Sequence, residues 1–278
     1  MSLQLNNIKK RIKSVSGAYK VTSAMKLVST VRLRKYKAKM LSNKTFTNEM
    51  EEIAKTVLSK ANKVDTPFNK INEEATKNLY VIISSTLGLC GSYNTNIFHV
   101  AERNITKDDD AIILGKKAIL YFKNGEFNKI DGFSDYSSFS DEKIIKEIIN
   151  LITKTYQEKV YKEIHLIYTE YKNSIVFLAK DFKLLPLDKL EEDESDVILE
   201  PTPEALVKML VPLYLSGVVH AKFLESEVCE QAARCNAMDN ATTNAEEILN
   251  TLKIQFNKAR QASITQEITE IVGAANSL

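Results

Sequence analysis

Apolar residues recur every three or four positions near both ends of the chain, which is the spacing of one face of an α-helix. The N-terminal stretch, residues 3–60, has no proline, and its one glycine is Gly17. Its apolar positions are Ile8, Ile12, Val15 and Tyr19, followed after a shift of face by Val21, Met25 and Val28. Such a helix spans about 80–90 Å and needs a partner helix, because helical propensity alone does not hold it.

The C-terminal stretch begins at Thr202-Pro203-Glu204, a typical helix start with a capping residue, a proline and then an acid. Pro212 lies about three turns further on and predicts a kink or a brief break. The predicted stripe consists of Ala241, Ala245, Ile248, Leu252, Phe256, Ala259 and Ser263, continued after a shift by Ile264, Ile268 and Ile271. Small and large residues alternating on one stripe favour a close two-helix coil.

Between these stretches, short apolar runs alternate with helical patterns. Strands are expected at residues 79–83, 111–115, 162–168 and 174–178, and helices at 94–103, 116–123 and 141–157, the last capped by Ser140. This alternation predicts a small, mostly parallel, Rossmann-like α/β domain.

The expected fold class is therefore α/β, with an antiparallel two-helix coiled coil added to the small domain. Residues 1–60 and 202–278 form the two shaft helices, and residues 78–200 form the α/β domain, which we call the foot. The helices must run antiparallel if both leave the same end of the domain.

Charge is distributed unevenly along this 278-residue chain, although its net charge is only +2. The first 48 residues hold 12 of the 38 lysines and arginines and no acid, which leaves 26 basic against all 36 acidic residues afterwards. A helix with one sign of charge seeks acidic surroundings, which nucleic acid, lipid headgroups or an acidic protein ring would provide.

Several candidate chemistries are absent or weak in this sequence. Cys90, Cys229 and Cys235 form no C-x-x-C pair, so we expect reduced, mostly buried thiols and neither a metal site nor a disulfide. No run approaches the roughly 18 apolar residues of a membrane span, and no catalytic constellation is visible. The acidic runs at residues 108–110 and 191–196 are interpreted as solvated loops.

Gly88-Leu89-Cys90-Gly91 follows an apolar strand as a phosphate loop would, but it lacks the Gly-Lys-Ser/Thr ending. A tight strand-to-helix turn is favoured over a nucleotide site.

Several long motifs resemble those of ATP synthase gamma subunits. They are residues 9–15 and 20–29 near the N-terminus, Gly88-Leu89-Cys90-Gly91 with Asn94, residues 227–234 with Ala237-Met238, and residues 257–272, the most specific match. The resemblance implies a rotor shaft, without catalytic residues, inside a ring of alpha and beta subunits that bind ATP, ADP and Mg²⁺. No cofactor is expected in this chain.

The resemblance also implies partners and contact residues. Met25 and Lys26 should lie near an acidic beta lever and against the C-terminal helix. Arg260 and Gln261 should bind a beta loop, and Gln266, Thr269 and Glu270 should face the ring or the Met25 region. The foot, with the loop of Gly88, Leu89, Cys90 and Gly91, should meet an epsilon-type subunit and the membrane rotor ring. The chain would lie peripherally on the cytoplasmic membrane face, without membrane insertion.

Three dipeptides depart from the pattern of the family that the chain resembles. They are Thr86-Leu87, where a charged pair is usual, Val211-Pro212, where an arginine is usual, and Asp239-Asn240, where a lysine is commoner. One alternative is therefore a gamma-like shaft of a paralogous ATPase that drives another process, such as motility. A basic coiled coil that binds nucleic acid is a second alternative, although the chain lacks interleaved aromatic residues.

Overall fold

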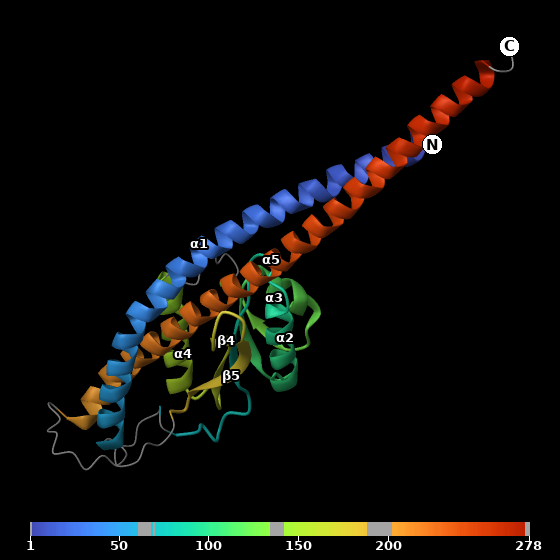
Figure 1. Ribbon diagram of the computed structural model, residues 1–278. Helices are drawn as coiled ribbons and strands as arrows, with labels where there is room; N and C mark the ends of the chain where they lie inside the picture. The colour runs from blue at the N-terminus through green and yellow to red at the C-terminus, as the bar shows by residue number, and fades with distance from the viewer. Residues whose placement is uncertain (1, 61–67, 69, 134–141, 188–201, 276–278) are drawn as a thin grey trace. The chain divides into compact units, whose positions relative to one another are not determined.

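The computed structural model describes residues 2–60, 68, 70–133, 142–187 and 202–275 (Figure 1). The helices are α1 (Ser2–Lys60), α2 (Tyr93–Asn104), α3 (Lys116–Tyr121), α4 (Glu142–Gln157) and α5 (Pro203–Ala275), with a 3-10 turn, η2, at Phe122–Asn124. The strands are β1 (Leu79–Ile83), β2 (Asp110–Leu114), β3 (Asn128–Ile130), β4 (Ile164–Tyr171) and β5 (Phe177–Leu185).

The chain forms two compact units, and α1 and α5 each contribute to both. The paired-helix unit comprises Met1–Thr30 and Arg234–Leu278, and the sheet unit comprises Val31–Ala233. The units are not consecutive segments of the chain, because each long helix runs through both of them.

The sheet has the strand order β3-β2-β1-β4-β5. β1 pairs in parallel with β2 and with β4, and β2 pairs in parallel with β3. Only β5 is antiparallel, next to β4. The expected small, mostly parallel sheet is thus confirmed, with β3 as a strand that the sequence did not indicate because it has three residues and no apolar run.

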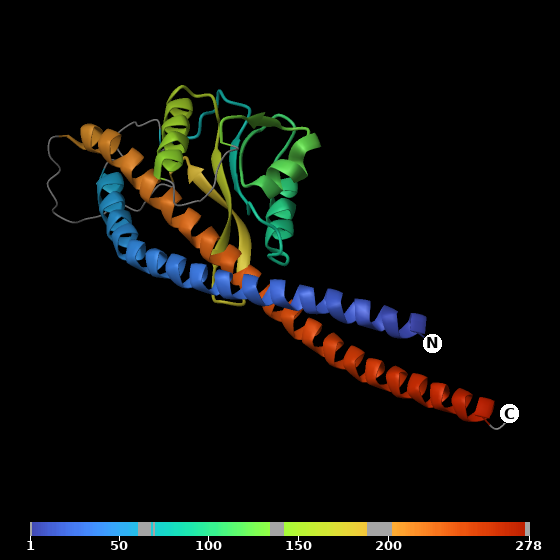
Figure 2. The same ribbon diagram turned by 90° about the horizontal axis from the view of Figure 1, so that it is seen from above.

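The sheet separates two apolar clusters, with α4 on one side and α2 and α3 on the other (Figures 1 and 2). Leu79, Val81 and Ile83 of β1 pack with α4 and the beginning of α5. Tyr80 and Ile82 pack with α2 and α3. This is the two-residue alternation of a strand covered on both faces, and it fixes the register of the sheet.

Two local expectations are wrong in detail. β5 begins at Phe177 and not at residue 174, because Asn173 Oδ1 accepts hydrogen bonds from the backbone N–H groups of Ile175 and Val176 and closes a turn there. Helix α5 continues through Pro212 without a break. Val211 and Leu215 are fully buried on either side of that proline, so core packing holds the helix across it.

One stretch of α5 is long and apolar enough to cross a membrane by length and composition alone, so the expectation that no such stretch exists was too strong. Some of the apolar residues near the start of α5 are core residues. Val207, Leu215, Val219 and Phe223 are all almost fully buried in the cluster shared with α4 and the sheet. Met209 and Leu213 in the same part of the helix are exposed, and 33% of the apolar window is buried.

The acidic run at residues 108–110 is not a solvated loop, because only Asp108 is exposed. Asp109 accepts hydrogen bonds from the N–H groups of Asn78 and Thr106, each at 2.8 Å. Asp110 Oδ2 accepts from Lys77 Nζ at 2.7 Å and from the Tyr161 hydroxyl at 2.8 Å. Both acids therefore fasten the start of β2 to its neighbours.

We expect Asp110→Asn to lower the free energy of unfolding by about 1–3 kcal/mol at neutral pH. Burial alone would raise the pKa of Asp110, but hydrogen bonds from Lys77, Asn128 and Tyr161 outweigh it and hold the pKa below the usual 3.8. A lowered pKa stabilises the fold above 3.8, and this contribution disappears as pH falls through the folded-state value.

Urea unfolding of both proteins between about pH 7 and pH 3 should therefore show a difference that shrinks with acid. Asp108→Asn at the neighbouring exposed position is the control, with an expected change below about 0.5 kcal/mol. Equal losses in the two variants would contradict the assigned role of Asp110.

Candidate partner-binding surface of the paired helices

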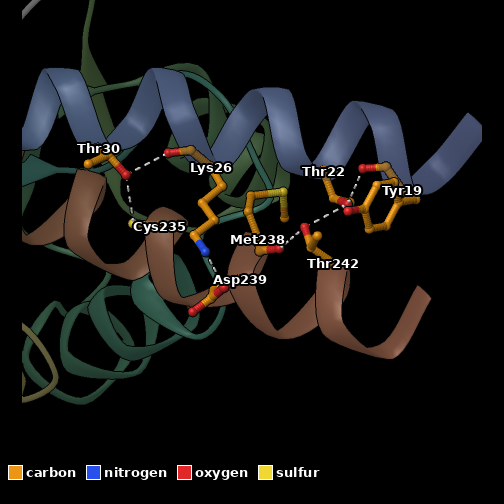
Figure 3. Close-up of polar contacts among 8 residues, drawn as sticks. All are labelled: Tyr19, Thr22, Lys26, Thr30, Cys235, Met238, Asp239 and Thr242. Carbon is orange, nitrogen blue, oxygen red and sulfur yellow. Dashed lines mark hydrogen bonds and ion pairs between the residues drawn. The ribbon is translucent and has the colours of Figure 1, made fainter. Parts of the chain in front are cut away.

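Figure 3 shows three polar contacts that join α1 to α5 within the paired-helix unit. They are Thr22 Oγ1 to Thr242 Oγ1 at 2.9 Å, Lys26 Nζ to Asp239 Oδ1 at 2.5 Å, and Thr30 Oγ1 to Cys235 Sγ at 3.3 Å. The residue number rises along α1 as it falls along α5, so the two helices are antiparallel. The expected antiparallel pairing is confirmed.

The shielded positions of each helix follow alternating steps of three and four residues, which we call the seam. On α1 these are Leu5, Ile8, Ile12, Val15, Tyr19, Thr22, Lys26 and Ser29. On α5 they are Cys235, Met238, Thr242, Ala245, Leu249, Leu252, Phe256, Ala259 and Ser263. This seven-residue repeat is the pattern of a two-stranded coiled coil.

The predicted shift of the α1 stripe to Val21 and Val28 is wrong, because these side chains are 58% and 52% exposed. The seam continues in register through Thr22 and Ser29, and Ser29 is only 2% exposed. On α5, Leu249 takes the place predicted for Ile248, which is 47% exposed. A seven-residue repeat is missed when only apolar residues are counted, because some of its seam positions hold polar residues.

Lys26 lies at this polar part of the seam, and Met25 is next to it in the sequence. Lys26 contacts α5 through Asp239, and the hydrogen bond and negative charge of Asp239 raise the pKa of the lysine. Met25 is partly buried. Both members of the ion pair remain about half exposed, so the pair stays accessible to a competing partner charge.

The other predicted contact residues lie near the free end of α5. Arg260, Gln261, Gln266, Thr269 and Glu270 are all exposed. Within the helix, Gln266 Nε2 donates to Glu270 Oε1 at 2.8 Å. Counting along α5 from Asp239 puts these residues about 30–45 Å away at 1.5 Å per residue, so they do not form one cluster with Met25.

This end of α5 also exposes Ile264, Ile268 and Ile271, at 49%, 56% and 70%. They were expected to continue the stripe against α1, and that expectation is wrong. α5 extends past the first residue of α1 (Figures 1 and 2), so these residues have no α1 residue to cover them.

The loop Gly88–Gly91 in the sheet unit is a tight turn, as expected. Leu89 and Gly91 both have positive φ, 62° and 57°. Asn94 braces the turn, because its Oδ1 accepts from the Ser85 N–H at 3.0 Å and its Nδ2 lies 3.2 Å from Cys90 Sγ. Cys90 is buried while Leu89 is 60% exposed.

The three cysteines are mostly buried, as expected: Cys90 and Cys229 are buried, and Cys235 is partly buried. Across the residues that the structure describes, no three or more His, Cys, Asp and Glu side chains are grouped as metal ligands. The acidic run at residues 191–196 and the predicted cap Ser140 lie outside the described residues.

Asp239 forms the ion pair with Lys26. We expect Asp239→Lys to lower the thermal midpoint of the paired helices at low salt, because it places two lysines side by side. The reversed pair, Lys26→Asp with Asp239→Lys, should recover it. Circular dichroism melts with and without about 0.5 M salt test this, since salt should shrink the effect. A reversed pair no better than the single variant would contradict it.

Comparison with known proteins agrees with this geometry. The family model described as ATP synthase matches residues 4–278. An ATP synthase gamma chain of Mycoplasma capricolum is 31% identical over 276 residues, covering 98% of both chains. That of Clostridium perfringens strain SM101 is 35% identical over 280 residues, again covering 98% of both. A chain in the Euglena gracilis mitochondrial ATP synthase structure with OSCP, F1 and c-ring has a TM-score of 0.69 at 19% identity, covering 100% of this chain and 95% of that one.

Proposed function

Since the chain belongs to the ATP synthase gamma-chain family, we propose that its paired helices are the central rotor shaft of an ATP synthase. The antiparallel seam carries this proposal. It joins residues 205, 213 and 220 positions apart in the sequence, so the two ends of the chain form one axle. A push on either helix is transmitted to the other through many side-chain contacts.

The shaft turns inside a ring of alpha and beta subunits, which bind ATP, ADP and Mg²⁺ and perform the catalysis. Met25, Lys26, Arg260, Gln261, Gln266, Thr269 and Glu270 are the proposed contacts with that ring. The acid-free start of α1 suits acidic beta levers. Exposed ion pairs contribute only about 0–1 kcal/mol each, so they can be exchanged one after another without trapping the rotor.

The sheet unit is proposed to bind an epsilon-type subunit and the membrane rotor ring, peripherally at the cytoplasmic face and coupled to protons. Leu87, just before the Gly88–Gly91 turn, and Leu89 within it are 55% and 60% exposed and supply apolar contact area. The two ATP synthase gamma chains compared above are similar to this chain over nearly its whole length. This similarity favours the synthase over a paralogous motor. Copurification of a membrane rotor ring with this chain distinguishes the two.

Rotation is the direct test. A bead attached through Leu120→Cys, an exposed position of α3 in the sheet unit, should turn in one direction when ATP is added to an immobilised ring. The buried Cys90 and Cys229 should label poorly, and Cys235→Ser removes the remaining thiol. A bead that stays still while the complex hydrolyses ATP at its full rate would rule out the rotor role.

A further inference from the structure

His165 of β4 lies between two carboxylates within the sheet unit. Its Nδ1 is 2.8 Å from Asp181 Oδ1 on the neighbouring strand β5, and its Nε2 is 3.2 Å from Glu163 Oε2, just before β4 begins. The side chain of His165 is only 13% exposed, and those of Asp181 and Glu163 are partly shielded. Solvent therefore screens these contacts less than it screens ion pairs at the surface.

Both ring nitrogens of His165 must carry a proton for both contacts to be attractive. Ionised carboxylates accept hydrogen bonds and do not donate them. A neutral imidazole has one N–H and one bare nitrogen, and here the bare nitrogen would face a carboxylate oxygen with no hydrogen between them. The geometry therefore fits the imidazolium ion, in which both nitrogens donate.

The electrostatic surroundings of the ring favour the same charged form. Burial alone would lower the pKa of His165, but the hydrogen bonds and negative charges of Asp181 and Glu163 outweigh it and raise the pKa above the usual 6.5. Tyr80 of β1 stacks on the imidazole, with ring centroids 5.0 Å apart. Burial, and after it the charge of Asp109, raises the pKa of Tyr80 to about 12, so this phenol stays neutral where His165 titrates.

The contacts of Asp181 connect the histidine to other elements of the sheet unit. Asp181 Oδ2 accepts a hydrogen bond from Asn104 Nδ2, at the end of α2, at 3.0 Å. The Asn104 carbonyl oxygen in turn accepts from the Tyr80 hydroxyl at 3.0 Å. Lys183, which is the register partner of His165 on β5, is exposed. One network thus joins β1, β4, β5 and α2, and His165 is at its centre.

We propose that His165, Asp181 and Glu163 form a pH-sensitive latch that strengthens the attachment of β5 to the sheet while the histidine is protonated. Loss of the proton leaves one N–H for two carboxylates and removes the positive charge between them, so the latch opens. Because the pKa is raised in the folded state, the stabilisation is present below about pH 6.5 and is lost as pH rises through the folded-state value. This regulation of the sheet unit goes beyond the rotor role and does not rest on it.

NMR of the imidazole nitrogens in the full chain tests the latch directly, and the signal of His165 is the one missing from His165→Gln. We expect both ring nitrogens of His165 to be protonated at pH 6 and its titration midpoint to lie above about 6.5. Asp181→Asn removes one carboxylate and should lower that midpoint by roughly one pH unit or more. Asp108→Asn removes an exposed acid from the same unit and, as the matched control, should shift it by less than about 0.3 unit.

Urea unfolding at two pH values measures what the latch contributes. His165→Gln should lower the folding equilibrium constant of the sheet unit by about tenfold or more at pH 6 and by less than about threefold at pH 9. His99→Gln, at an exposed position of α2, should change it by less than about threefold at both. Near-UV circular dichroism follows the transition.

Two results would overturn the proposal. One is a His165 ring that titrates at or below about 6.5 in the folded chain, and the other is a loss in His165→Gln that is equal at pH 6 and pH 9. The NMR titration of the unmodified chain decides the matter even if a variant does not fold. Neither measurement involves partner subunits, so failure of the rotor assignment would leave both results unchanged.

Discussion

Gly115→Ala is expected to lower the free energy of unfolding of the sheet unit by at least about 3 kcal/mol. Gly115 follows β2 with φ +94°, a backbone conformation that L-residues rarely adopt. A Cβ there would lie 2.2 Å from the backbone oxygen of Ser84 and 2.6 Å from its Oγ, far inside van der Waals contact. Backbone strain and steric collision therefore both contribute to the expected loss of free energy of unfolding.

Ser84 cannot move away without further loss. Its N–H donates to the Leu114 carbonyl at 2.9 Å, and its Oγ accepts from the Ala118 N–H at 3.1 Å. These bonds hold the end of β1 against β2 and the start of α3. A shift of Ser84 leaves buried polar groups without partners, each costing about 1–3 kcal/mol.

Substitutions at two other glycines distinguish the effect of backbone strain from that of the steric collision. Gly132 also has positive φ, +106°, but a Cβ there meets nothing within 4 Å, so Gly132→Ala should cost only about 1 kcal/mol of strain. Gly17→Ala in α1 meets nothing and should stabilise the helix by roughly 0.5–1 kcal/mol. Urea unfolding by near-UV circular dichroism measures all three. Equal losses at Gly115 and Gly132 would show that the collision is absent.

The sheet could be predicted from the sequence because its strands are buried on both faces and read as continuous apolar runs. Leu79–Ile83 and Asp110–Leu114 are each fully buried, and both runs were visible. β3 escaped prediction because its three residues, Asn128–Ile130, are largely polar and partly exposed. Its pairing with β2 is decided by tertiary contacts.

The seam was predictable where it is apolar and not where it is polar. Ile8, Ile12, Val15 and Tyr19 predicted the face of α1 correctly, whereas Thr22 and Ser29 concealed its continuation. Extending the three-and-four steps of these apolar residues through Thr22, Lys26 and Ser29, despite their polarity, gives the observed seam. Burial of Asp109 and Asp110 was not predictable, because their partners Asn78 and Tyr161 are distant in the sequence.

The contact residues on α5 came from family resemblance, and the structure adds only their exposure. Arg260 and Gln261 are on the surface of the paired-helix unit. The sequence of one chain cannot show which exposed residues touch a partner, because the partner supplies half of each contact. Their role in binding the ring remains a prediction that mutation must test.

Arg260→Glu is expected to lower the ATPase turnover of the assembled complex by about tenfold or more. A hydrogen bond to a charged group contributes about 1.5–3 kcal/mol. The new carboxylate would also repel the oxygen atom that accepts the arginine's hydrogen bond. Arg260 is exposed on α5. The helicity of the isolated chain should therefore stay the same.

Lys253→Glu is the matched control, because Lys253 is also exposed and lies two helical turns earlier on the same side of α5. Both variants change the net charge equally, so a general electrostatic effect would lower turnover in both. A specific contact at Arg260 predicts a change within about twofold for Lys253→Glu. Turnover unchanged by Arg260→Glu in a fully assembled complex would remove Arg260 from the ring contacts, and the torque would have to pass through the remaining surface of the shaft.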